Sequence, residues 1–132
     1  VVKSYQPIGM PDSDLNYLNY SATDLSGSFA SGSVVVSKSS QTHSLYFLVN
    51  NTYKVPQFGT VFVDRLGLSV FQFVKGFQLQ NGDKLFNQDG SWIEVTSVSE
   101  VNQNQTFYSL DVEDIDTYFS SDVLVHNLPK KF

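Results

Sequence analysis

Short apolar runs separated by turn-forming residues occupy the chain from Val34 to Val125. Residues 92–98 alternate apolar and polar side chains, which is typical of a strand with one buried face and one wet face. No long amphipathic pattern with helical spacing interrupts these runs, so the sequence predicts an all-β fold. The expected strands cover residues 34–36, 44–49, 54–55, 60–63, 69–73, 84–86, 92–98, 106–112 and 122–125.

Three dipeptides predict turns between these strands: Asn50-Asn51, Gly82-Asp83 and Asp89-Gly90. Asp-Gly is favoured in two-residue hairpin turns because both central positions adopt positive φ angles there. Apolar residues flank the last pair, with Phe86 before it and Trp92 after it. We therefore expect a β-hairpin centred on Asp89-Gly90.

The first 33 residues are polar and rich in glycine, proline and serine. We expect them to form turns, together with a short helix that begins at Asp12 or Ser13, whose side chains can cap it. The whole chain has 132 residues, of which 41% are hydrophobic. This length and apolar content suit one folded domain.

Charge and composition argue against several classes of function. The net charge is −5 and the eight Lys and Arg residues are scattered, whereas nucleic-acid binding needs clustered cations. With no cysteine and two histidines, these residues contain no disulfide or cysteine nucleophile, and too few histidines for a typical zinc site. No membrane-length apolar stretch or signal-peptide pattern is present, so a cytoplasmic protein without a membrane partner is the default expectation. We expect no metal and no cofactor.

Two motifs follow one another near the end of the chain. Residues 107–119 read Phe-Tyr-Ser-Leu-Asp-Val-Glu-Asp-Ile-Asp-Thr-Tyr-Phe, and residues 123–127 read Val-Leu-Val-His-Asn. At this spacing they resemble the last two strand motifs of the Hint family, which includes inteins, bacterial intein-like domains and hedgehog autoprocessing domains. Residues 82–85, Gly-Asp-Lys-Leu, and the strand at 92–98 resemble the middle of the same domain.

The resemblance is specific over residues 82–127, less specific over residues 34–81 and loose over residues 1–33. It implies a Hint domain over residues 1–127, built from bent β-hairpins with pseudo-twofold symmetry. Residues 128–132 would then be a flanking tail, equivalent to the sequence that follows an intein.

The same resemblance implies a self-processing reaction. In the family, the terminal asparagine, here Asn127, attacks its own backbone carbonyl through its side-chain nitrogen, forming a succinimide and releasing the downstream amine. An amide nitrogen is a poor nucleophile, so most of the rate must come from positioning. The adjacent histidine, here His126, would give a proton to the carbonyl oxygen or to the leaving nitrogen. The bond expected to break joins Asn127 to Leu128.

Several positions depart from the family's pattern. Asp116 stands where the family commonly has an assisting histidine; an ionised Asp116 would orient His126, and the alternative is a solvated turn carboxylate. Ser109 stands where the family often has a helper aspartate, with Asp111 nearby as a candidate for that role. Leu128 stands where splicing needs Cys, Ser or Thr, so a branched intermediate cannot form there. Cleavage is therefore expected in preference to full splicing.

The family's Thr-x-x-His motif is also altered. Alignment of residues 45–63 with the family puts Pro56 at the threonine position and Gly59 at the histidine position. His43 precedes the first strand of this pair, whereas the family's motif follows it. We therefore expect His43 to be a turn histidine.

The family's opening segment, which begins with a Cys or Ser nucleophile, is not evident at Val1, and a start at Ser28 would leave too little chain before residue 45. The resemblance implies an N-terminal intein segment that is supplied by another chain or has been lost, and a host protein of cellular, viral or phage origin. Three functions stay open: a split autoprocessing domain, a degenerate Hint domain kept as a structural module, and an unrelated all-β binding module. A surface-loop His-Asn pair would fit the last two.

Overall fold

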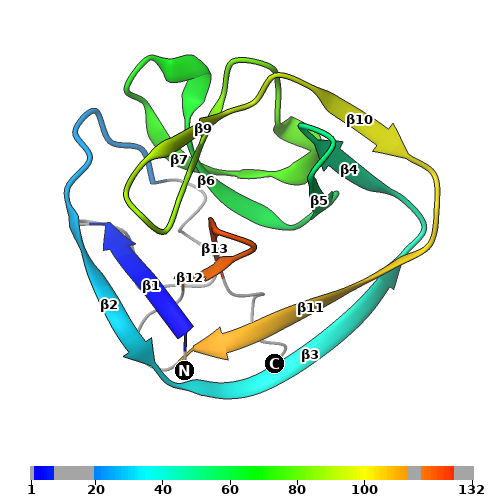
Figure 1. Ribbon diagram of the computed structural model, residues 1–132, viewed down its shortest axis with the longest axis horizontal. Coiled ribbons are helices and arrows are strands. Elements are labelled where there is room, and N and C mark those ends of the chain that lie inside the picture. Colours follow the sequence, from blue (N-terminus) through cyan, green and yellow to red (C-terminus); the bar gives the residue numbers. More distant parts are fainter. Residues whose placement is uncertain (1, 8–19, 113–116, 127–132) are drawn as a thin grey trace.

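The computed structural model describes residues 2–7, 20–112 and 117–126, and within them the chain is almost entirely β-structure, as predicted. The strands curl into an open ring, with β3 and β11 forming a long curved ribbon along one side (Figure 1). The strands are β1 (Val2–Pro7), β2 (Gly27–Ser33), β3 (Val35–His43), β4 (Tyr46–Val49), β5 (Tyr53–Pro56), β6 (Thr60–Asp64), β7 (Phe71–Lys75), β8 (Lys84–Phe86), β9 (Trp92–Glu94), β10 (Val98–Val101), β11 (Gln105–Val112), β12 (Thr117–Ser120) and β13 (Val123–His126), and the 3-10 turns are η2 (Arg65–Gly67) and η3 (Gly76–Gln78).

Strand β6 is the centre of the largest sheet, and all of its residues are buried. Its sheet has the order β12-β13-β6-β8-β9, and β7 also pairs with β6. Successive side chains of a strand point to opposite faces. Phe62 accordingly joins an aromatic core cluster, while Val61 and Val63 join an aliphatic one. One strand thus supplies both cores.

The remaining strands form three smaller antiparallel sheets. These are the pair β1-β2, the three-stranded sheet β10-β4-β5, and the ribbon of β3 and β11. The ribbon runs from the pair Gln105 and His43 to the pair Val112 and Val35, with a register shift next to Asp111. In the described part of the chain, neither ribbon strand pairs with a third strand.

The predicted turns are confirmed. Asn50 and Asn51 both have positive φ angles, 54° and 55°, and connect β4 to β5. Gly90, with φ 86°, turns the β8–β9 hairpin. In that turn the hydroxyl and the backbone N–H of Ser91 donate to the Asp89 carboxylate, which lowers the pKa of Asp89 below its ordinary value.

The expectation of turns and a short helix in residues 1–33 missed two strands. Strand β1 pairs with β2, and Tyr5 lies opposite Phe29 with the ring centroids 4.9 Å apart. Strand β2 is rich in glycine and serine, so its own residues predict a strand poorly. Its partner strand and the aromatic contacts supply the stabilisation instead. The helix expected at Asp12 or Ser13 lies outside the described residues.

Several predicted strands have different limits; β4, for example, begins at Tyr46, two residues later than expected. Strand β3 continues through a polar segment to His43, because β11 provides a pairing partner along its length. Strand β7 begins at Phe71, two residues later than expected.

The single strand expected at 92–98 is divided into β9 and β10. Val95 leaves the β8–β9 pairing. Its N–H donates to the Asp83 carbonyl at 2.7 Å, and its carbonyl accepts from the Gly82 N–H at 2.8 Å. The Asn50 side-chain oxygen then accepts from the N–H groups of Thr96 and Ser97. The segment thereby changes partners, from β8 to β4.

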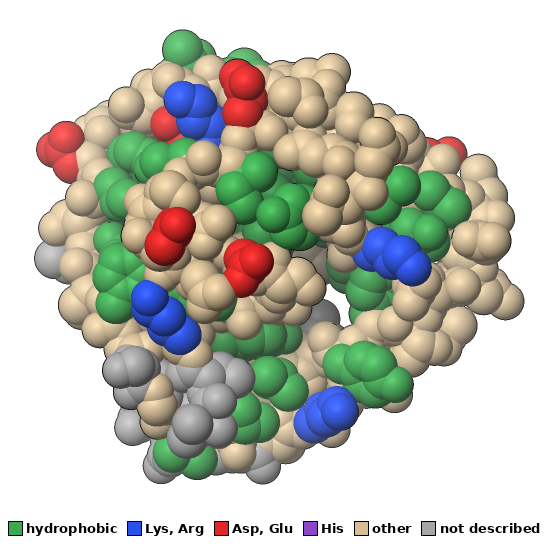
Figure 2. Space-filling view, viewed as in Figure 1, with side chains coloured by type: hydrophobic (Ala, Val, Ile, Leu, Met, Phe, Trp, Pro, Cys, Tyr) green, Lys and Arg blue, Asp and Glu red, His purple; other side chains and the backbone are tan. Residues whose placement is uncertain are grey.

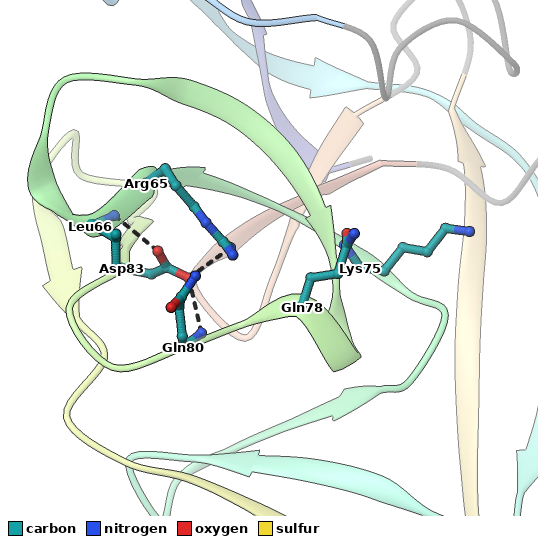
Figure 3. Close-up of polar contacts among 6 residues, drawn as sticks. All are labelled: Arg65, Leu66, Lys75, Gln78, Gln80 and Asp83. Atoms are coloured by element: carbon teal, nitrogen blue, oxygen red, sulfur yellow. Dashed lines mark hydrogen bonds and ion pairs between the residues drawn. The ribbon is translucent and has the colours of Figure 1, made fainter.

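The Asp83 carboxylate explains the Gly82-Asp83 signature, because it joins three segments from a fully buried position (0% exposed). Its Oδ1 accepts from the backbone N–H of Leu66 at 2.9 Å, and its Oδ2 accepts from the N–H of Gln80 at 3.0 Å (Figure 3). The Arg65 guanidinium donates to the same Oδ2 at 3.1 Å. A buried charge needs such partners, so this aspartate is structural.

We expect Asp83→Ala to lower the free energy of unfolding by about 3 kcal/mol, because it leaves two backbone N–H groups and a half-buried guanidinium without their acceptor. Urea unfolding followed by circular dichroism measures this change. The matched control is Glu100→Gln, which alters an exposed carboxylate on β10. Equal stability of the two variants would contradict the structural role of Asp83.

A second prediction concerns alkaline pH. Burial raises the pKa of Tyr5 and of Tyr20 above 10.0, so the folded protein keeps phenol protons that the unfolded chain loses. The free energy of unfolding should therefore fall as pH rises above about 10. Tyr5→Phe should make this fall shallower between about pH 9 and pH 11, whereas Tyr108→Phe, at an exposed position, should not. An identical pH dependence in all three proteins would refute the assignment.

Candidate functional site

His126 is the last residue of β13, which lies between β12 and β6. Thr117 of β12 lies opposite His126, and Val125 pairs with Val61 of β6. The β12–β13 hairpin turns at Ser121 and Asp122, whose φ angles are 48° and 73°. Two consecutive positive φ angles are typical of the tight turn that fixes the register of a hairpin. The turn thus determines the register of the hairpin and with it the position of His126 opposite Thr117.

The His126 side chain is buried, with 5% of its surface exposed, and its Nε2 atom is inaccessible to solvent. Its ring meets Phe73 of β7 edge-on, with centroids 5.5 Å apart and planes at 83°. The opposite strand is fixed as well, because the buried Thr117 hydroxyl donates to the Tyr5 carbonyl at 2.6 Å. A histidine held in this way is not part of a solvated surface loop.

A cavity of about 470 Å³ has His126 in its wall. It lies between the ribbon on one side and β5, β6, β12 and β13 on the other, and Figure 2 shows the corresponding hollow bordered by hydrophobic and positively charged side chains. The lining residues from the ribbon are Gln41, His43 and residues 106–109. Those from the opposite wall are residues 52–56 and 58–61, Leu85, Tyr118, Ser120, Ser121, Val123, Val125 and His126.

Pro56 and Gly59, which the sequence resemblance puts at the Thr-x-x-His positions, line the same cavity as His126. The N–H of Gly59 donates to the carbonyl of Pro56 at 3.1 Å. A Cβ atom on residue 59 would lie 2.5 Å from Cγ of Pro56, so the proline leaves room only for glycine. The two substitutions are therefore sterically coupled, and together they put neither a hydroxyl nor an imidazole at these positions.

The other predicted site residues are only partly brought together. Ser109 lines the cavity, whereas Asp111 lies further along β11 opposite Ser37 and is not among the described lining residues. Asn127, Asp116 and Leu128 lie outside the described residues.

The expectation that His43 lies in a turn is wrong. His43 is the last residue of β3 and lies opposite Gln105, because the polar part of β3 continues to that residue. It lines the cavity at its ribbon side. Its ring contacts Phe107 edge-on at 5.9 Å.

Two aromatic residues at the site were not predicted there. Phe73 contacts the His126 ring, and this contact depends on the pairing of β7 with β6. Tyr118 contributes a hydroxyl that accepts the N–H of Leu110 at 3.2 Å and so links β12 to the ribbon.

Within the described ranges, no group of three or more His, Asp or Glu side chains is arranged to hold a metal ion. The helices described there are too short and too polar to cross a membrane.

Comparison with solved structures identifies the architecture. The structure is similar to the solution structure of a bacterial intein-like domain from Clostridium thermocellum, with a TM-score of 0.59 and 22% sequence identity over 78% of this chain and 74% of that one. The fold is the intein-like Hint fold. The strand connectivity is therefore not that of a β-sandwich. No protein-family model matches the sequence, and no curated protein matches it either.

The Pro56–Gly59 pair gives a prediction about this cavity wall. Gly59→Ala should lower the free energy of unfolding by about 1–3 kcal/mol, because the new methyl group overlaps the proline ring. Adding Pro56→Ala should restore much of that loss, since it removes the atoms that clash. Thermal melting of both single variants and the double variant measures the coupling. Additive effects of the two substitutions would contradict it.

Proposed function

We propose that this domain cleaves its own chain between Asn127 and Leu128 by cyclisation of Asn127. The observation that supports the proposal best is the placement of His126. This residue directly precedes Asn127, and strand pairing and the Phe73 contact hold it in the wall of a cavity within an intein-like fold.

The reaction needs no co-reactant. The Asn127 side-chain nitrogen forms a bond to the Asn127 carbonyl carbon and loses a proton, and the bond from that carbon to the Leu128 nitrogen breaks. The leaving nitrogen gains a proton, so the products are a C-terminal succinimide and a free amine. His126 is proposed as the donor of that proton, since it directly precedes Asn127 and its ring is held at a buried position. Asp116 is proposed to orient His126, and Asp111 is the second candidate helper.

Cleavage without splicing follows from Leu128, which has no hydroxyl or thiol to accept an upstream acyl group. An N-terminal intein segment supplied by another chain is proposed to complete the domain for this reaction. If that segment positions the scissile bond, it raises the rate without contributing to ring closure itself.

A second candidate function is a structural module that has kept the fold and lost the reaction. The Pro56–Gly59 packing favours it, because that packing excludes from the cavity the side chains that the family carries at these positions. The two functions differ in one observable, the release of the sequence that follows Asn127.

A fusion of a reporter domain after Phe132 tests the proposal. We expect slow release of a fragment that begins at Leu128, measured by intact-mass spectrometry over days, with and without candidate N-terminal segments. Asn127→Ala should abolish release because the ring can no longer form. His126→Ala should slow release by roughly 100-fold or more because the leaving amine loses its proton donor.

His43→Ala is the matched control, since this second histidine lines the same cavity but belongs to the ribbon. It should leave the rate unchanged, and Leu128→Ser should leave cleavage intact. Release that persists in Asn127→Ala would indicate proteolysis of the chain by contaminants. No release in any context would favour the structural module.

A further inference from the structure

The chain contains nine asparagines, and only Asn81 is followed by glycine. In such a pair the backbone nitrogen of the glycine can attack the side-chain carbonyl of the asparagine, because no side chain crowds the attacking nitrogen. The Gly82 nitrogen forms a bond to Cγ of Asn81 and loses its proton, while the Cγ–Nδ2 bond breaks and Nδ2 gains a proton and leaves as ammonia. Water then opens the succinimide ring to give aspartate or isoaspartate, in which the main chain runs through the former side chain.

The structure places this pair in a tight turn. The N–H of Asp83 donates to the carbonyl of Gln80 at 3.1 Å and closes a turn over residues 80–83. Gly82, at the third position of this turn, has a φ angle of 96°, as a type II turn requires there. Asn81, at the second position, is exposed, so water reaches the residue that would react.

Two hydrogen bonds hold the attacking nitrogen in place. The Gly82 N–H donates to the carbonyl of the buried Val95 at 2.8 Å, and the Val95 N–H donates to the Asp83 carbonyl at 2.7 Å. Ring closure requires the Gly82 nitrogen to lose its proton and to approach Cγ of Asn81. The bond to Val95 therefore has to break first, because it fixes both that proton and the position of the nitrogen.

The Asp83 carboxylate holds the same turn from the other side. It accepts the N–H groups of Gln80, within the turn, and of Leu66, in η2 (Figure 3). The carboxylate is fully buried, so a movement of the turn that separates it from these donors leaves a buried charge without its partners. Opening of the 80–83 turn therefore costs free energy in the folded chain.

From these contacts we infer that Asn81 is a deamidation site controlled by the fold, at which the reaction proceeds only in molecules whose 80–83 turn has opened. The isoaspartate product has one additional main-chain carbon before residue 82, which displaces Asp83 from its partners. A turn that has reacted in this way cannot close again in its original form. The modification thus records the opening permanently. It is independent of the proposed cleavage, which uses a different asparagine, Asn127.

Deamidation and amide exchange, both measured on the full chain, test the inference. Peptide mapping by mass spectrometry follows the conversion of Asn81, and hydrogen exchange detected by NMR follows the opening of the Gly82 amide. A synthetic peptide of residues 78–85 is the unfolded reference for both rates. The fold should slow deamidation and Gly82 exchange by the same factor, within about threefold, because both need the same opening. Equal deamidation of chain and peptide, or a rate that does not follow Gly82 exchange as urea is added, would overturn the inference.

Matched variants test what holds the turn closed. Asp83→Asn removes the charged acceptor and should speed the conversion of Asn81 by at least about fivefold, whereas Glu100→Gln, at an exposed position on β10, should change it by less than about twofold. Arg65→Gln removes only the guanidinium donor to the carboxylate, so it should speed conversion less and serves as the second variant if Asp83→Asn does not fold. Equal rates in all these variants would contradict the role of Asp83.

Further controls identify the reacting residue. Asn81→Gln should abolish the conversion, because the longer side chain would have to close a six-membered ring. Asn104 is also exposed but is followed by glutamine, and it should stay unmodified over the same period. Asn127→Ala should leave the rate at Asn81 unchanged, so failure of the proposed cleavage and failure of this inference are separate results. Conversion of Asn104 at the rate of Asn81 would contradict the site.

The stability of the products tests the permanence of the change. The isoaspartate form of the aged chain, isolated by chromatography, should unfold at a lower urea concentration than Asn81→Asp, which carries the same charge on an unaltered main chain. Equal unfolding midpoints would contradict the claim that the reacted turn cannot close.

Discussion

The position of β13 between β12 and β6 is the constraint on which the candidate site depends. Val123 and Leu124 are both buried, the first in the aliphatic cluster and the second in the aromatic one. A slip of one residue would exchange these two faces and turn His126 away from Phe73. Because two separate cores specify the register, the histidine at the end of the strand is fixed by packing that lies several residues away.

The ribbon of β3 and β11 is held less firmly than the rest of the ring. A two-stranded ribbon alone is marginally stable in water, and most β3 side chains are exposed. Its described contacts with the body include the Tyr118 hydroxyl at Leu110, the Lys54 ammonium at Gln105, and the Tyr46 ring against Phe107. These contacts connect the ribbon to the strands on the opposite side of the cavity.

The sequence predicted the strands whose residues are apolar and the turns whose residues need positive φ angles. Residues 60–63 are buried as expected, and Asp89-Gly90 forms the expected hairpin. Strands β2 and β3 were missed or shortened because their glycine, serine and lysine residues are stabilised only by distant partners. Such pairing is not encoded in the local composition.

For the site, the C-terminal motif singled out His126, which the structure places at a buried position in the cavity wall, while its proposed role stays a prediction. Its contact with Phe73 and the shared cavity with Pro56 and Gly59 depend on how β6, β7 and β13 assemble, which residue spacing does not reveal. The coupling between Pro56 and Gly59 also needs three-dimensional distances, because the two residues appear in the sequence as independent substitutions.

The chemical form of the chain terminus created by cleavage tests the central claim most directly. Tandem mass spectrometry of the upstream product, taken early and at mildly acidic pH to limit ring opening, reads the state of its last residue. The account predicts a product that ends at Asn127 and is one water lighter than the hydrolysed peptide, which identifies a succinimide. A product that ends at Asn127 with an ordinary carboxylate from the start, or that ends elsewhere, would contradict it.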